Sequence, residues 1–274
     1  MEIARYLFKF YYIGLKRFYG SQRQLNKLTI EDCLIEALLK KNYILSLRNS
    51  GFEVASRTDR LVSARGAVFS IKSKKNPILM EINSALPKQI GVWAYAKVPI
   101  TFLSRFNAKY RHYKYFMPIT QNLNLGIINK ACKELEGRHD FKNFSKRDNE
   151  HINTIRDMMS IYTSIKEDYI IFNFKSKAFL RQQIRRMVAK LIELGMNEIS
   201  YNDFKSLLNS NEYKSYQPAN PIGLILWDVV YNKEIKFIHD IKSIERMKNL
   251  FSKLEKESNQ KRLLFKILQL NNIG

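Results

Sequence analysis

The chain has 274 residues, of which 47 are Lys or Arg and 25 are Asp or Glu, so its formal net charge at pH 7 is +22. This excess is far larger than solubility requires and is spread along the chain, which indicates a folded basic surface that binds a polyanion. Nucleic acid is favoured over an acidic membrane, and no apolar stretch approaches the roughly 20 residues that span a bilayer. Hydrophobic residues make up 45% of the chain, which excludes a disordered protein and suits one large domain or two of ordinary size.

The N-terminal segment MEIARYLFKFYYIG predicts a strand over residues 6–13 rather than a targeting peptide, because Glu2, Arg5 and Lys9 interrupt its apolar run. Cys33 and Cys132 are far apart in the sequence, and the four histidines form no metal-ligand spacing with them. We therefore expect no disulfide and no zinc site, with Cys33 as a small core residue. A soluble protein of the reducing cytoplasm fits this pattern.

The first half of the chain reads as β-α-β-β-β. A polar connection, KRFYGSQRQ, follows the first strand, and a helix is expected over residues 30–41 because Thr29 and Asp32 have the spacing of a capping box. Further strands are expected at 52–56, 66–73 and 91–99, with a short helix between Pro77 and Pro87.

The second half has the same character without a recognisable repeat. We expect a strand at 110–119, a helix at 127–137 closed by Gly137, a hairpin within 158–176, a helix at 179–194 and a strand at 224–231. A basic amphipathic tail follows, with apolar residues at positions 241, 244, 250, 251 and 254. Two α+β halves that share or face antiparallel sheets are the predicted architecture.

One acidic residue stands out in the stretch SRTDRLVSAR at 56–65, where Asp59 lies among Arg57, Arg60 and Arg65. Its simplest interpretation is a turn cap or a local balance of charge. No phosphate-binding Walker loop, dinucleotide-binding GxGxxG or nucleophile-elbow GxSxG pattern occurs in the chain, so the chemistries that use them are not favoured.

The segment KAFLRQQIRRMVAKLIELG adds a second unusual feature, because Arg181 and Arg185 fall on a helical stripe that continues through Val188 and Ile192. A half-buried arginine needs a carboxylate or phosphate partner, unless its head reaches water from the edge of the apolar face. The chain therefore contains an acid without an evident role and an arginine without an evident partner.

Six blocks in order along the chain resemble the tRNA pseudouridine synthase A family. They are FYGSQRQ at 18–24, SRTDRLVSARG at 56–66, FLSRFNAKYRHYKY at 102–115, LEGRHDFKNFSK at 135–146, KAFLRQQIRRMV at 177–188 and PIGLILWDVVY at 221–231. The resemblance implies two RRM-like or ferredoxin-like α+β halves that form an extended, mainly antiparallel sheet flanked by helices. It places the active-site cleft between them. The expected divisions are 1–104 with the catalytic loop, 105–235, and a basic helical extension at 236–274.

The resemblance implies that this chain isomerises uridine to pseudouridine in tRNA, in the anticodon stem-loop, without metal, cofactor or ATP. Asp59 matches the catalytic aspartate, and Arg185 matches the arginine that pairs with it. Tyr113 matches the tyrosine that stacks on the target uracil and assists proton transfer. Arg57 matches the residue that helps displace the target nucleotide. These residue types suit a base that must be flipped out of an RNA stem before its glycosidic bond is cleaved.

The resemblance further implies a cytoplasmic homodimer that binds tRNA across both subunits. Arginines expected to contact RNA are Arg57, Arg23, Arg60, Arg105 and Arg181. Tyr115, His112 and His139 are expected to be structural or to contact phosphate. The chain departs from the bacterial pattern at Arg60, Leu61 and Ser63 in the catalytic loop, and at Ser21, where an aromatic residue is common.

Two alternatives remain at the level of sequence. One is a tRNA-binding protein or RNA chaperone that keeps the fold without turnover, and the other is an RNA-cleaving enzyme that uses Asp59 with His139. For the isomerase we expect the Asp59 carboxylate within about 4 Å of the Arg185 guanidinium, since one ion pair would satisfy both groups. Tyr113 should face the same space, and Arg57 should lie at its rim.

Overall fold

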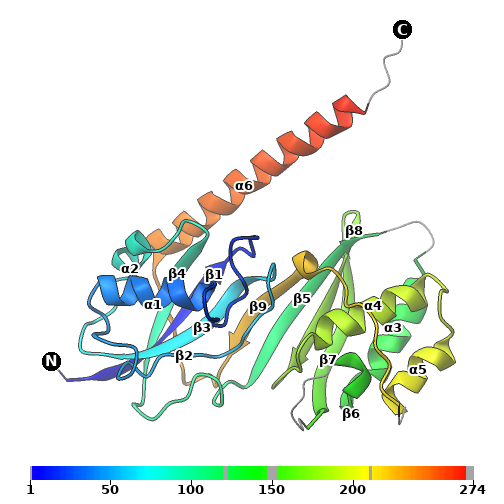
Figure 1. Cartoon of the computed structure of the whole chain (residues 1–274), viewed down its shortest axis with the longest axis horizontal. Helices are drawn as coiled ribbons and strands as arrows, with labels where there is room; N and C mark the ends of the chain where they lie inside the picture. The colour runs from blue at the N-terminus through cyan, green and yellow to red at the C-terminus, as the bar shows by residue number, and fades with distance from the viewer. Residues whose placement is uncertain (1, 120–122, 147–152, 210–211, 270–274) are drawn as a thin grey trace.

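One sheet runs through the whole molecule, with helices packed against it (Figure 1). The structure is a computed structural model that describes residues 2–119, 123–146, 153–209 and 212–269. Within these ranges the sheet has ten strands in the order β10-β4-β1-β3-β9-β5-β8-β7-β6, and β2 pairs with β3. Neighbouring strands are antiparallel except β3 and β9, which are parallel. The expected α+β fold with a large, mainly antiparallel sheet is confirmed.

The N-terminal half follows the predicted order closely. Its elements are β1 (Ala4–Tyr12), α1 (Ile30–Lys40), β2 (Glu53–Val54), β3 (Ser63–Ser73), α2 (Leu79–Ala85) and β4 (Ile90–Val98). Alternate residues of β1 carry aromatic rings into the core, where Phe8 stacks on Phe69 of β3 with ring centroids 4.9 Å apart. Helix α1 begins with the predicted capping box, because the Thr29 hydroxyl accepts from the Asp32 N–H at 3.3 Å and the Thr29 N–H donates to the Asp32 carboxylate at 3.1 Å.

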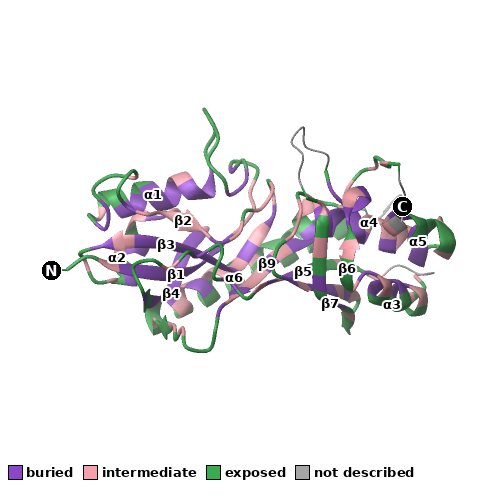
Figure 2. Ribbon diagram, turned by 90° about the horizontal axis from the view of Figure 1, so that it is seen from below, coloured by how far each residue is buried: buried purple, intermediate pink, exposed green. Residues whose placement is uncertain are grey.

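The C-terminal half contains more elements than the sequence predicts. They are β5 (Tyr110–Pro118), α3 (Leu125–Glu134), β6 (Gly137–Asp140), the 3-10 turn η1 (Lys142–Phe144), β7 (Ile155–Lys166), β8 (Tyr169–Ser176), α4 (Gln183–Gly195), α5 (Tyr201–Asn209), the 3-10 turn η2 (Pro221–Gly223) and β9 (Leu224–Val230). Buried residues follow the sheet and the helix faces that contact it, and they continue from one half to the other (Figure 2).

Strand β9 joins the two halves, because it pairs with β5 on one side and with β3 on the other. The contact with β3 is close at Gly66, where an added Cβ would lie 2.7 Å from the Trp227 carbonyl oxygen. The segment that contains Asp59 leads directly into β3 and therefore lies at this joint. The residue boundaries expected for separate domains, 1–104, 105–235 and 236–274, stay predictions.

Two helices predicted in the second half are wrong in their bounds. Helix α4 begins at Gln183 rather than at residue 179, because Gln182 has the left-handed φ of +59° and a right-handed helix cannot pass through it. Arg181 therefore precedes the helix and is not part of the stripe with Arg185. Helix α3 ends at Glu134, and Gly137, with φ of +85°, begins β6 instead of closing the helix directly.

The C-terminal extension forms β10 (Ile238–His239) and a 28-residue helix, α6 (Ile241–Leu268), which projects away from the body (Figure 1). Only its first turns are docked, where Met247 and Phe251 pack near Tyr11 and Trp93. Ile241 is 72% exposed, which contradicts its expected place on the apolar face. No helix within the described residues is long and apolar enough to cross a membrane.

The capping box of α1 provides a test of local helix stability. We expect Thr29→Ala to lower the free energy of unfolding by about 1 kcal/mol, because it removes a buried N-cap hydroxyl. Urea denaturation should show a lower midpoint at an unchanged slope. Thr101→Ala, at an exposed position, serves as the control. Equal midpoints for the two variants would contradict the assignment of Thr29 as the cap.

Candidate active site

Asp59 lies in the loop between β2 and β3. Hydrogen bonds hold this loop against the segment that precedes α1. The Thr58 N–H donates to the Ser21 hydroxyl at 2.7 Å, and the Ser21 N–H donates to the Thr58 carbonyl at 3.2 Å. On the other side of the loop, the Gly14 N–H donates to the Ser63 hydroxyl at 3.0 Å. Ser21 and Ser63 therefore hold the loop on both sides of Asp59.

The turn after Asp59 has an unusual backbone conformation. Leu61 has φ of +69°, a left-handed conformation that favours glycine. The Val62 N–H donates to the Asp59 carbonyl at 3.3 Å and closes the turn. Gly14 packs against it so closely that an added Cβ would lie 2.3 Å from the Leu61 carbonyl carbon. Leu61 thus adopts the left-handed conformation although it is not a glycine, and the surrounding contacts stabilise this strained backbone.

Asp59 and Arg185 form the predicted ion pair between the loop and helix α4. Arg185 Nη1 lies 3.0 Å from Asp59 Oδ2, and the two side chains are 10% and 31% exposed, respectively. The Arg185 Nε–H donates to the Ala219 carbonyl at 2.7 Å, and the Ala219 N–H donates to the Arg185 carbonyl at 3.0 Å. The predicted separation of less than about 4 Å is confirmed. Ala219 was not predicted, since a backbone acceptor leaves no sequence signal.

Tyr113 lies on β5 with its side chain buried. Its hydroxyl is 2.8 Å from the Ser56 hydroxyl, three residues before Asp59, and its ring meets the Phe179 ring edge-on at 5.2 Å. The pKa of Tyr113 is raised to about 12, mainly by burial and also by the Asp59 charge, while Ser56 and Arg111 act in the opposite direction. The phenol is therefore neutral near pH 7 and able to donate a proton or a hydrogen bond.

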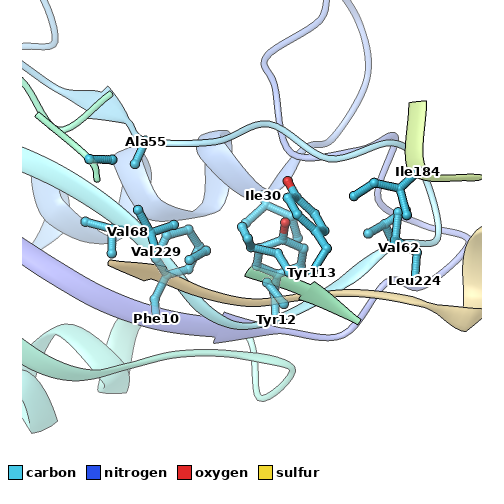
Figure 3. Packing of buried hydrophobic residues seen from close by; sticks show 14 of the residues in the cluster. Phe10, Tyr12, Ile30, Ala55, Val62, Val68, Tyr113, Ile184, Leu224 and Val229 are labelled. Carbon is cyan, nitrogen blue, oxygen red and sulfur yellow. The ribbon is translucent and has the colours of Figure 1, made fainter. Parts of the chain in front are cut away.

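A second hydroxyl pair lies beside the first, because the Tyr12 hydroxyl is 2.6 Å from the Thr58 hydroxyl. Figure 3 shows the Tyr12 and Tyr113 rings close together near Ile30 of α1, with their hydroxyl groups pointing toward the loop. Burial raises the pKa of Tyr12 above its ordinary value, so this phenol also stays neutral. The two tyrosines thus support the loop from below through Ser56 and Thr58.

Arg111, on the same strand as Tyr113, connects three segments through their backbone carbonyls. Its guanidinium donates to the carbonyl oxygens of Ala55, Arg105 and Lys177. The side chain is buried, and burial lowers its pKa from the ordinary arginine value. Arg111 therefore fixes the start of the Asp59 loop relative to β5. Sequence analysis did not single it out, because the acceptors come from distant parts of the chain.

Comparison with known proteins finds relatives that match almost the whole chain. A family described as tRNA pseudouridine synthase matches residues 131–232. The tRNA pseudouridine synthase A of Methanosphaera stadtmanae is 33% identical over 97% of this chain and all of its own length. The corresponding proteins of Archaeoglobus fulgidus and Thermococcus sibiricus are 34% and 36% identical over 98% and 90% of this chain, and over 97% and 92% of their own lengths.

The chain belongs to the tRNA pseudouridine synthase family. The family membership expected from the six sequence blocks is therefore confirmed, and with it the class of enzyme, an isomerase of tRNA uridines. The near-complete coverage of both chains shows that the similarity extends over both halves of the sheet and is not confined to the Asp59 loop.

The arginines expected to contact RNA in this synthase are dispersed over its surface. Arg57 is exposed. Burial raises the pKa of the nearby Glu31 carboxyl, whereas the Arg23 N–H and the Arg57 charge lower it. The Arg23 side chain pairs with Asp32 at 3.0 Å and lines an open hollow of about 530 Å³ whose walls do not include Asp59. Arg60 lies over the Tyr19 ring at 4.1 Å.

Two of these arginines lie farther along the chain. Arg105 is exposed in the connection between β4 and β5, where its N–H donates to the Glu53 carboxylate at 3.2 Å. Arg181 is exposed just before α4, and its carbonyl accepts from the Lys146 N–H at 3.0 Å. Neither residue belongs to the Asp59–Arg185 pair.

His112 and His139 have structural partners in this synthase. The His112 ring lies 3.1 Å from the Asn173 side-chain oxygen, and burial lowers its pKa. The His139 ring forms a hydrogen bond with the Glu136 carbonyl at 2.6 Å. His139 lies on β6, which is five strands from β3 in the sheet, or about 24 Å at 4.8 Å per strand. This position argues against an RNA-cleaving pair of Asp59 and His139. No group of three or more metal-ligating side chains occurs in the described ranges.

The environment of Tyr113 predicts an alkaline dependence of stability. A tyrosine in an unfolded chain ionises near pH 10, whereas Tyr113 in the folded protein stays neutral up to about 12. Between these values the unfolded chain releases a proton that the folded state keeps, so the free energy of unfolding falls as pH rises. Urea denaturation across this range should show a shallower fall for Tyr113→Phe than for the unmodified enzyme. Identical slopes would contradict the buried, neutral phenol.

Proposed function

We propose that this enzyme isomerises uridine to pseudouridine in the anticodon stem-loop of tRNA, with Asp59 as its catalytic carboxylate. The observation that carries the proposal is the pairing of the single acid in an arginine-rich loop with a largely buried arginine at 3.0 Å. In the reaction the bond from ribose to uracil nitrogen 1 breaks, and carbon 5 of the same base becomes bonded to the ribose. Carbon 5 loses its proton to solvent and nitrogen 1 takes up a proton, so the atoms balance and no other reactant is needed.

The geometry suits the charges of this reaction. An ionised carboxylate is needed near the ribose, either as nucleophile or as base toward the 2′ position, and both routes fit Asp59. Arg185 stabilises the negative charge, and the bond from its Nε–H to Ala219 fixes the direction of the guanidinium. The neutral phenol of Tyr113 can assist proton transfer, and its ring with Phe179 offers an aromatic wall for the flipped base.

The surface arginines complete the proposal. Arg57, two residues before Asp59 and exposed, is placed to help displace the target nucleotide. Arg23, Arg60, Arg105 and Arg181 contribute phosphate contacts, which position the RNA without reading its sequence. The net charge of +22 supports an extended RNA surface.

Substituting Asp59 separates catalysis from binding. We expect Asp59→Asn to abolish tritium release from tRNA labelled at carbon 5 of uridine, because only base rejoining at that carbon frees the label. The affinity for tRNA should persist, and its dependence on salt should keep the same slope, roughly −0.7 to −0.9 per neutralised phosphate on logarithmic axes. Loss of binding together with turnover would make Asp59 structural. Binding without turnover in the unmodified protein would identify a non-catalytic tRNA-binding protein.

We also propose that the enzyme acts in the cytoplasm as a homodimer whose two subunits share one tRNA. The spread of positive charge over a single chain suits a substrate larger than one active site. Sedimentation at micromolar concentration should give a dimer. A monomer with full activity in the tritium assay would contradict this arrangement.

A further inference from the structure

Two consecutive arginines of α4 have different partners. Arg185 pairs with Asp59, whereas the guanidinium carbon of Arg186 lies 5.1 Å from the centre of the Tyr216 ring. Lys190, one turn further along α4, lies over the same ring at 4.4 Å. Arg186 is 5% exposed, and within the described residues its Nε and Nη1 atoms are buried without a hydrogen-bond partner. The Tyr216 ring is therefore a principal contact of a buried cation.

Tyr216 belongs to a segment, residues 213–219, that crosses α4 without helix or strand of its own; we call it the strap. At one end the Lys214 N–H donates to the Asn143 side-chain oxygen at 2.8 Å. At the other end Ala219 exchanges two hydrogen bonds with Arg185, one to its backbone and one to its side chain. Because the strap has no regular hydrogen-bond ladder, its course over α4 depends on a few contacts, and Tyr216 lies midway between the two ends.

The position of the Ala219 carbonyl decides the direction of the Arg185 guanidinium. Its Nε–H bond to Ala219, at 2.7 Å, orients the planar group so that Nη1 meets Asp59 at 3.0 Å. A lateral shift of the strap would move this acceptor and turn the guanidinium away from the carboxylate. Misplacement of a reacting group by about 1 Å can lower a rate by roughly a hundredfold.

We propose that Tyr216 is a positioning residue, which holds the strap on α4 through Arg186 and Lys190 and thereby keeps Arg185 directed at Asp59. This inference rests on the proposed catalytic role of Asp59. The ring rather than the hydroxyl carries the effect, because the Tyr216 hydroxyl is buried without a hydrogen-bond partner in the described part of the chain. Burial also raises the pKa of this phenol, so the ring stays neutral beneath the two cations.

The kinetic test compares Tyr216→Ala with Tyr216→Phe in the full-length enzyme. At saturating tRNA, Tyr216→Ala should lower the rate of tritium release at least about tenfold, since it acts on alignment, while the tRNA dissociation constant changes less than about twofold. Tyr216→Phe keeps the ring and should retain the rate of the unmodified enzyme. A normal rate for Tyr216→Ala, or an equal loss for Tyr216→Phe, would overturn the inference.

Tyr201 of α5 offers a matched control. Lys130 lies over its ring at 4.6 Å, and its hydroxyl donates to Glu134 at 3.2 Å, but it does not contact the strap. Tyr201→Ala should therefore leave the rate of tritium release unchanged. If Tyr216→Ala fails to fold, Tyr216→Leu keeps apolar bulk without the aromatic contact and should show the same loss of rate. If Tyr201→Ala lost as much rate as Tyr216→Ala, the loss would reflect general destabilisation, and the inference would be overturned.

A double-mutant cycle tests the path from Tyr216 to Asp59 independently of activity. In urea denaturation, the destabilisation by Tyr216→Ala should fall to about half in the Asp59→Asn background, because the two sites are coupled through Arg185. Additive effects would overturn the inference. Failure of the proposed function is distinguishable, because it would appear as an active Asp59→Asn enzyme. If Asp59→Asn is inactive and Tyr216→Ala keeps its full rate, the proposed function stands and only the role of Tyr216 is contradicted.

Discussion

The ion pair between Asp59 and Arg185 connects residues 126 positions apart, and the geometry of the candidate active site depends on it. Removing charges from water costs several kcal/mol per ion, and the attraction offsets this only when the geometry is good and the remaining donors are satisfied. The structure meets this condition with the Ala219 carbonyl, which accepts the Arg185 Nε–H. The pair therefore joins the Asp59 loop of the first half to helix α4 of the second.

The scaffold around this pair holds the loop in place by hydrogen bonds and apolar packing. Strand β9 lies between β3 and β5 and makes one sheet of both halves. Ser21 holds Thr58, and the Arg111 guanidinium collects backbone carbonyls from three segments. A loop that carries function is commonly positioned in this way by a rigid framework. In Figure 3, Val62 of the loop meets Ile184 of α4 and Leu224 of β9, so the apolar core continues beneath the site.

Several features were predictable because their signals are local. The capping box at Thr29, the aromatic strand β1 and the helical segment that carries Arg185 follow from local residue patterns. The start of α4 was not predictable in this way, because the left-handed conformation of Gln182 has no glycine or asparagine to announce it. The same limitation misplaced Arg181, which belongs to the loop before the helix.

The sequence by itself determined the chemical types: a basic surface, one acid within an arginine-rich loop, and a helical arginine in need of an anion. It also determined the family, through six blocks in the right order. Only the tertiary structure decided which groups meet, because Ala219, Ser56 and the acceptors of Arg111 act through backbone atoms or small hydroxyls. Such groups occur throughout any chain, and a partner becomes specific only when the folded backbone places one of them within hydrogen-bond distance.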